Sequence, residues 1–179
     1  MGNIPSLEEL LAAGVHFGHR ESKRHPKMDP YVFGVRNGVH IIDLEKTREK
    51  LAEACAAAQA LARQGKTFLF VGTKDQAMPI IREAAERVGM PYVVGRWLGG
   101  TITNFSIIGK VIHKYRSLIR SRDTGELAQK YTKFEQSQMN QEIARLEDSV
   151  GGIADLNKLP DAMFIVDIIE EETAVREAA

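Results

Sequence analysis

The sequence predicts an α/β fold in which helices cover both faces of a parallel β-sheet. Three short apolar segments, at residues 67–72, 91–95 and 162–168, are typical of buried strands. Helical patterns separate them, and this alternation is typical of a parallel sheet. Two amphipathic stripes between residues 105 and 149 interrupt the alternation, so we predict a protruding antiparallel helical hairpin there.

This pattern divides the chain into two expected domains. Residues 1–104 and 150–179 would form the α/β domain, and residues 105–149 would form the inserted hairpin. Within the hairpin, Asp-Thr-Gly at 123–125 breaks the first helix. Thr132 and Glu135 have the spacing of a capping box and mark the start of the second.

The first thirty residues predict a short helix followed by a long loop. Ser6 and Glu9 match a capping box, which favours a helix over residues 6–13. Residues 14–30 are rich in Gly, His and Pro, so we expect an irregular loop, and long ordered loops usually carry function. The start MGNIPS also fits the N-myristoylation pattern. The capping box is the preferred interpretation, and no membrane partner is expected.

A hairpin and a long helix are expected next. Asn37-Gly38 lies between two apolar runs, and this dipeptide is a strong signal for a tight β-turn. Asp43 is placed to cap a helix over residues 44–63. In the later part of the chain we expect a helix over residues 75–88.

Charge is distributed unevenly, although the net charge is zero. Seven Arg and Lys residues and no acid lie between Arg87 and Arg122, and five bases face two acids between Arg20 and Arg36. From Asp123 to the end, thirteen acids stand against five bases. The asymmetry indicates one face for a polyanion and another for solvent or protein.

The first candidate site is the loop RWLGGTITN after the second strand. Open α/β sheets bind ligands at the carboxyl ends of their strands. Arginine, tryptophan and neutral donors there suit contact with an RNA backbone. The candidates are Arg96, Trp97, Thr101, Thr103 and Asn104. A core position for Trp97 and a helix-capping role for Asn104 remain open alternatives.

The second candidate site is the basic part of the N-terminal loop. The loop candidates are His16, Phe17, His19, Arg20, Lys23, Arg24 and Lys27. Zinc at His16 and His19 is a weak alternative, because no cysteine or suitably spaced acid lies nearby. Simple solvation of the lysines is another.

Isolated basic residues elsewhere complete the set. Lys74 follows Gly72-Thr73 at a strand end, where a helix N-terminus could hold a phosphate, although a plain turn is the simpler interpretation. Lys110 and Lys114 on the hairpin are further RNA candidates. The Walker A, GxGxxG and GxSxG patterns do not occur, so we expect neither an enzyme nor a cofactor or metal.

Five segments resemble one protein family. They are AGVHFGH (13–19), PKMDPYVFGVRNGVHIIDLEKT (26–47), FLFVGTK (68–74), RWLGGTITN (96–104) and SVGGIADLNKLPDAMFIVD (149–167). With them the chain resembles the S-two family of bacterial small-subunit ribosomal proteins.

This resemblance implies a flavodoxin-like domain with a projecting hairpin. It also implies a structural, non-catalytic role on small-subunit ribosomal RNA, next to other ribosomal proteins that include the large messenger-binding one. By position, it implies RNA contact at residues 16–27, at Arg36 and Asn37 on the hairpin, and at residues 96–104. The implied location is cytoplasmic, in the ribosome, and a single cysteine, Cys55, fits a reducing compartment.

The sequence departs from the family's pattern at its end. Family members continue from a helix like EEETAVREAA into another strand, whereas the sequence ends at Ala179. We therefore expect an unpaired strand edge.

Two other functions compete with RNA binding. A nucleotide-using enzyme is suggested by the fold alone, which licenses little. A protein-docking module is suggested by the acidic C-terminal half and the hairpin, and it is compatible with RNA binding.

Overall fold

The computed structural model describes residues 4–179, which form two compact units that meet in sequence between Gly65 and Lys66. Gly2, at which the sequence fits the myristoylation pattern, lies outside the described residues. The boundary follows the helix predicted over 44–63, and Gly65 has a left-handed backbone (φ 70°) that ends it.

The first unit contains an antiparallel sheet and two α-helices. Its elements are α1 (Leu7–Ala12), β1 (Phe17–Arg20), the 3₁₀ helices Glu21–Lys23 and Pro26–Tyr31, β2 (Val32–Arg36), β3 (Val39–Ile42) and α2 (Leu44–Arg63). The expected caps are confirmed. Ser6 and Glu9 form a complete capping box, and the Asp43 carboxylate accepts the N–H groups of Glu45 and Lys46.

The prediction of an irregular loop over residues 14–30 was wrong. Its first part forms β1, which pairs with β3 so that Phe17 lies opposite Ile41 and Arg20 lies opposite Val39. Local composition hid this strand, because the pairing joins segments about twenty residues apart and a bulge interrupts its alternation.

The predicted hairpin is confirmed in the same sheet. β2 pairs with β3 in the order β1-β3-β2, and the tip falls at Asn37 and Gly38. Both tip residues have positive φ angles, 52° and 73°. This is the conformation that makes Asn-Gly favourable in two-residue hairpin turns.

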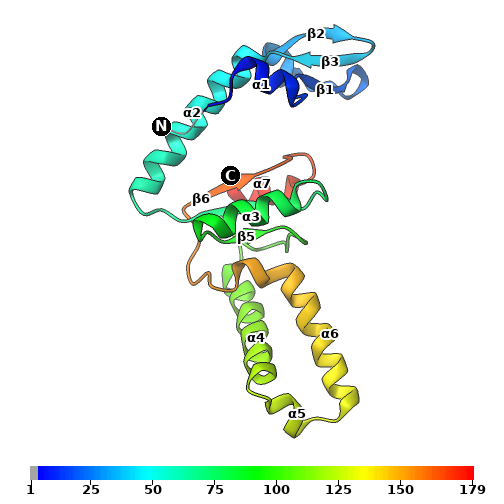
Figure 1. Ribbon diagram of the computed structural model, residues 1–179, viewed down its shortest axis with the longest axis vertical. Coiled ribbons are helices and arrows are strands. Elements are labelled where there is room, and N and C mark those ends of the chain that lie inside the picture. Colours follow the sequence, from blue (N-terminus) through cyan, green and yellow to red (C-terminus); the bar gives the residue numbers. More distant parts are fainter. Residues whose placement is uncertain (1–3) are drawn as a thin grey trace. The chain divides into compact units, whose positions relative to one another are not determined.

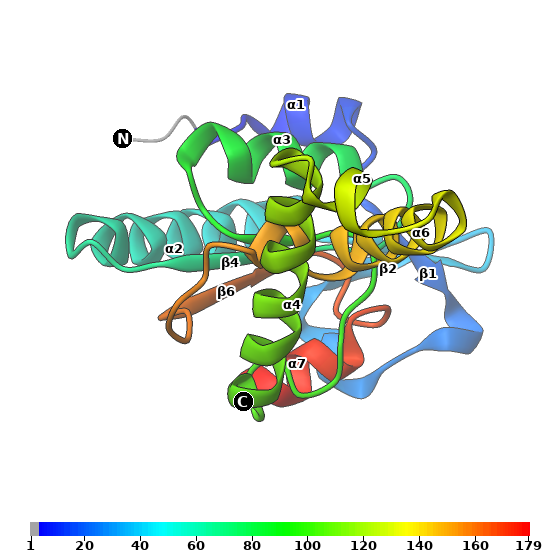
Figure 2. The same cartoon turned by 90° about the horizontal axis from the view of Figure 1, so that it is seen from below.

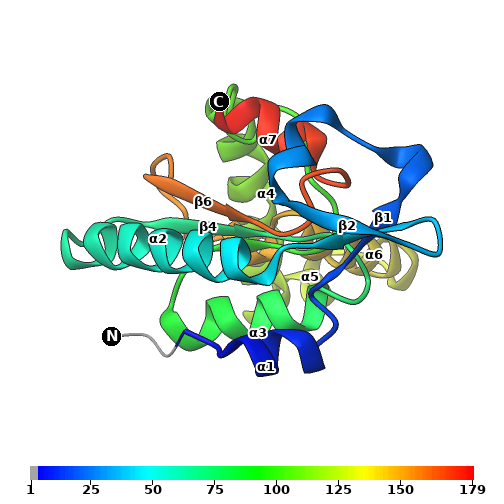
Figure 3. The same ribbon diagram turned by 90° about the horizontal axis from the view of Figure 1, so that it is seen from above.

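The second unit contains the predicted parallel sheet. Its elements are β4 (Phe68–Val71), α3 (Met78–Val88), β5 (Tyr92–Val93), α4 (Phe105–Asp123), α5 (Glu126–Lys130), α6 (Lys133–Val150), a 3₁₀ helix at Gly151–Ile153, β6 (Ala162–Ile165) and α7 (Glu172–Ala178). The strand order is β5-β4-β6, and both pairs are parallel. Figures 2 and 3 show α3 and α7 on opposite sides of β4 and β6.

The helix expected over residues 75–88 begins three residues later than predicted. α3 starts at Met78, and a turn over residues 74–77 separates it from β4. Pro79 lies in the first helical turn, as predicted, where its missing N–H costs nothing. The strand end at Lys74 therefore does not run directly into a helix N-terminus.

The amphipathic stripes form an antiparallel pair of helices, α4 and α6, with the short α5 at the far end (Figure 1). The capping box of Thr132 and Glu135 starts α6, as predicted. The α5 turn was not predicted. The stripes face each other with six buried side chains: Ile108, Ile112, Tyr115, Ile143, Leu146 and Val150.

The hairpin shares one hydrophobic core with the sheet. Leu69 and Val71 of β4 belong to the same buried cluster as Ile112 and Val150. Gly95 permits the close approach, because an added Cβ would collide with the Asp148 backbone oxygen. The base of the hairpin is thus a structural part of the second unit.

Candidate nucleic-acid interface

The loop over residues 96–104 is held by one carboxylate from α7. Glu177 accepts the indole Nε1–H of Trp97 (3.1 Å) and the backbone N–H groups of Gly100 (2.8 Å) and Ile102 (2.9 Å). The N–H of Thr103 also donates to it, at 3.3 Å. A glutamate thus occupies the position that a phosphate could have taken in this set of donors.

The carboxylate stays charged in this place. Burial alone would raise the pKa of Glu177, but the N–H groups of Ile102 and Gly100 and the Trp97 indole stabilise the anion and hold its pKa below the ordinary value. Glu177 is therefore anionic at neutral pH and complements the loop.

This arrangement separates the predicted residues of the loop. Thr101 is 1% exposed and donates its hydroxyl to the Leu98 carbonyl, so its side chain is inside the protein. Trp97 is half-buried against the core, consistent with the alternative considered for it. Asn104 takes the N-cap position of α4 without a capping hydrogen bond, and its side chain accepts from Ser106. Arg96 is exposed and forms no ion pair within residues 4–179.

The strand end at Lys74 is occupied in the same manner. Lys74 pairs with Asp167 (Nζ to Oδ2, 2.7 Å), which lowers the pKa of that carboxyl. The Thr73 N–H donates to Glu171, which is only 3% exposed, at 2.6 Å. Both strand-end loops of the second unit therefore have their donors bound to internal carboxylates.

The N-terminal candidates lie on a sheet. Arg20 of β1 and Arg36 of β2 both pair with Val39 of β3, so the register places their side chains on one face. Phe17 is paired with Ile41 two positions along β3 and belongs to the same face. Its ring is 67% exposed and lies 4.0 Å from the half-buried ring of His16.

Some basic side chains of the first unit form ion pairs with a carboxylate, and others do not. Arg24 forms a two-point ion pair with Asp29, with Nε 2.9 Å from Oδ1, so its charge is balanced. The other bases of the predicted set have no ion-pair partner in the described part of the chain. They are Arg20, Lys23, Lys27 and Arg36. His19 and Asn37 are also exposed.

On the hairpin, only one of the two predicted lysines is free of an ion pair within residues 4–179. Lys114 pairs with Glu142 across the two helices, at 2.7 Å, whereas Lys110 is exposed and unpaired within residues 4–179. His113 and Arg120 lie on the same face of α4, are exposed and form no ion pair in the described part of the chain. His113 was not predicted, although its spacing of three residues from Lys110 is a usable signal.

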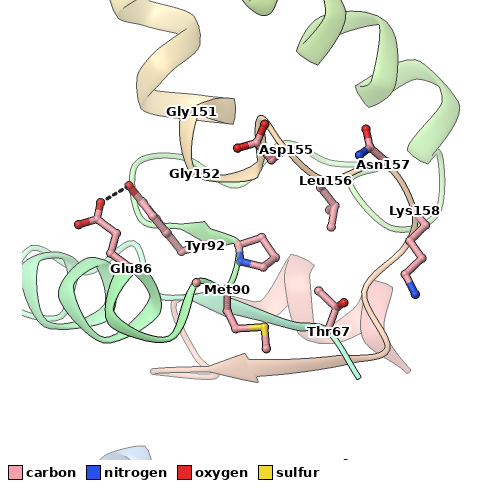
Figure 4. A pocket seen from close by; sticks show the side chains of 12 residues that line it. Thr67, Glu86, Met90, Tyr92, Gly151, Gly152, Asp155, Leu156, Asn157 and Lys158 are labelled. Carbon is pink, nitrogen blue, oxygen red and sulfur yellow. Dashed lines mark hydrogen bonds between the residues drawn. The ribbon is translucent and has the colours of Figure 1, made fainter. Parts of the chain in front are cut away.

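Other features do not suggest a small-molecule site. A hollow of about 660 Å³ is lined by Thr67, Met90 and Tyr92, with the Tyr92 hydroxyl donating to Glu86 (Figure 4). It lies at the amino ends of β4 and β5, opposite to where α/β sheets usually place ligands. Within residues 4–179 no group of three or more potential metal ligands is found, and no helix there could cross a membrane.

Comparison with known proteins places the chain in a family. The family model described as ribosomal protein S2 matches residues 10–179. "Small ribosomal subunit protein uS2" of Coprothermobacter proteolyticus is 46% identical over 98% of this chain and 65% of its own length. The proteins of the same name in Fusobacterium nucleatum (46% identity, 98% of this chain, 71% of the relative) and Chlorobaculum tepidum (49%, 96%, 69%) are equally similar. The chain spans only about two thirds of the length of these relatives. On the family match and these identities, it belongs to the ribosomal protein S2 family.

Proposed function

We propose that this protein is a non-catalytic constituent of the small ribosomal subunit that binds small-subunit ribosomal RNA. Its family membership supports this role, because the relatives carry the name of a small-subunit protein. The single structural observation that carries the proposal is the set of unpaired cations beside an exposed aromatic ring on one sheet face. Such a surface suits phosphates and bases, and no reactive side chain is needed.

The proposed interface has two parts. The first is the face of the β1-β3-β2 sheet with the adjoining 3₁₀ turns, and it contains Phe17, His19, Arg20, Lys23, Lys27, Arg36 and Asn37. The second is the exposed face of α4 with Arg96 before it, where Lys110, His113 and Arg120 form no ion pair within residues 4–179. Lys74, Lys114 and Arg24 are kept as weaker candidates, because each is already bound to a carboxylate.

The fold supports this proposal rather than an enzymatic one. We infer a flavodoxin-like arrangement in which residues 105–149 are an insertion into the α/β domain of residues 1–104 and 150–179. In such folds a nucleotide would use the donors at the strand ends. Here Glu171 and Glu177 occupy those donors, which disfavours a nucleotide cofactor.

Scaffolding of neighbouring ribosomal proteins is the second part of the proposed role, and the resemblance implies that the large messenger-binding protein is one of them. The far end of the hairpin supports a protein contact, because Phe134 is 71% exposed there. Deleting the hairpin would not test this, since its base belongs to the core. Phe134→Ser leaves that core intact and should reduce association with a protein neighbour while sparing RNA affinity.

The test of the main proposal is reconstitution with purified small-subunit RNA over a series of salt concentrations, followed by sedimentation. We expect the protein to travel with the RNA and the affinity to fall steeply with salt, because phosphate contacts release counterions. Absence of co-sedimentation, or binding that does not depend on salt, would contradict the proposal.

A further inference from the structure

We infer that the face of the β1-β3-β2 sheet is a subsite for an unpaired nucleobase, which stacks on Phe17 while its neighbouring phosphates contact Arg20 and Arg36. This inference deepens the proposed RNA-binding function and rests on it. It names the part of the RNA that is recognised, a single-stranded nucleotide rather than a duplex backbone.

The register of the sheet places the residues of the subsite in two neighbouring rows. In one row across the sheet, Phe17, Ile41 and Gly34 are neighbours. In the next row, Arg20, Val39 and Arg36 are neighbours. Partners in an antiparallel sheet share a face, and so do residues two positions apart along β3. The Phe17 ring and the guanidinium groups of Arg20 and Arg36 therefore lie beside the same apolar strip, which consists of Ile41 and Val39 of β3.

The shape of this strip leaves room for a planar ligand. Phe17 projects with 67% of its surface exposed, and the ring of His16 lies beside it. Across Ile41, Gly34 has no side chain, and a Cβ added there would meet nothing within 4 Å. An exposed ring next to an unfilled position is suited to a flat base, and stacking on aromatic rings is the usual way in which proteins bind unpaired bases.

The charged residues around Phe17 and Phe33 distinguish the two exposed rings of this sheet. Arg20 and Arg36 have no ion-pair partner among the residues of the described unit. Glu21 is the nearest acid in sequence, and Asp29 is already bound by Arg24. The exposed ring of Phe33, by contrast, lines a groove together with the carboxylates Glu8, Asp43 and Glu45. Ile41 and His16 also line this groove, whereas Phe17 does not. The acids should repel RNA from Phe33, so we expect the two exposed rings of one sheet to behave differently.

The experiment compares variants at these two rings in binding to purified small-subunit ribosomal RNA. Phe17→Ala should weaken the affinity about 5- to 100-fold, the range that corresponds to the loss of one stacked base. Its salt dependence should stay that of the wild type, because no phosphate contact is lost. Phe33→Ala is the matched control, and its affinity should remain within about twofold of the wild type.

Two further variants distinguish a loss of the subsite from a folding defect. Gly34→Leu places a side chain over the strip, and because its Cβ would meet nothing within 4 Å, the variant should fold normally and weaken binding. Phe17→Trp should keep the affinity, and its fluorescence should be quenched by RNA beyond any change of the native Trp97. A single-stranded 12-nucleotide RNA of mixed sequence should compete better than the same RNA in a duplex.

The outcomes separate this inference from the function on which it rests. If the wild-type protein fails to bind ribosomal RNA, the proposed function falls. If the wild type binds and Phe17→Ala is indistinguishable from it, the stacking subsite alone is overturned. Equal losses in Phe17→Ala and Phe33→Ala, or better competition by the duplex, would also overturn it.

Discussion

The loop over residues 96–104 and the face of the N-terminal sheet contain similar residue types but differ in availability. In the loop, Trp97 and three backbone N–H groups all donate to Glu177. On the sheet, Phe17 projects into solvent and Arg20 and Arg36 have no acidic partner within residues 4–179. The comparison teaches that aromatic and cationic residues indicate a binding surface only where the fold leaves them without internal partners.

The largest expected effect concerns the closed region. Ile112→Ala should reduce the free energy of unfolding by about 2–5 kcal/mol, because Ile112 is buried between α4, α6 and the sheet. Lys110→Ala, two residues before it on the exposed face, should change stability by about 0.5 kcal/mol or less. Urea denaturation measures both. Equal effects would show that the hairpin does not share the core.

The next effect tests the carboxylate itself. Glu177→Ala should cost about 2–3 kcal/mol, because it leaves the loop donors unpaired, and it should shift the emission of Trp97, the only tryptophan. Glu172→Ala is the control, since Glu172 pairs only with the exposed Arg176. An unchanged Trp97 spectrum in Glu177→Ala would mean that the loop does not depend on α7.

A smaller effect is expected on the open surface. Arg20→Ala and Arg36→Ala should each lower the slope of log affinity against log salt by about one unit, without a loss of stability. Arg24→Ala should lower it less, because Asp29 already balances that charge. Filter binding to small-subunit RNA at several salt concentrations distinguishes them. A larger change in Arg24→Ala than in the other two variants would contradict the proposed role of the unpaired arginines.

The smallest effect is pH dependence. A carboxyl whose pKa is depressed by folding stabilises the native state above its unfolded pKa, and this contribution is lost as the pH falls through the folded value. The stabilisation by Glu177 should therefore be intact at neutral pH and decline below about pH 4.3, the ordinary glutamate pKa. Trp97 emission during acid titration should report this step, and Glu177→Gln should abolish it.

Local sequence patterns predicted most helices and strands, but they did not predict which side chains remain without internal partners. Capping boxes, the Asn37-Gly38 turn and helical periodicity depend on residues close in sequence, so they could be recognised. The strand at Phe17–Arg20 and the hold of Glu177 on residues 97–103 join distant segments, and composition has no signal for them. Glu171 and Glu177, which accept from these donors, belong to the acidic segment that the charge pattern assigned to solvent or protein.

Hydrogen–deuterium exchange of the wild-type protein, free and bound to small-subunit RNA, should show which of the two regions contacts the RNA. The amides of Gly100 and Ile102 should be protected already in the free protein, because Glu177 accepts both. New protection on RNA binding should arise over residues 17–36. The opposite pattern, with rapid exchange at Gly100 and Ile102 in the free protein that RNA then suppresses, would contradict the account.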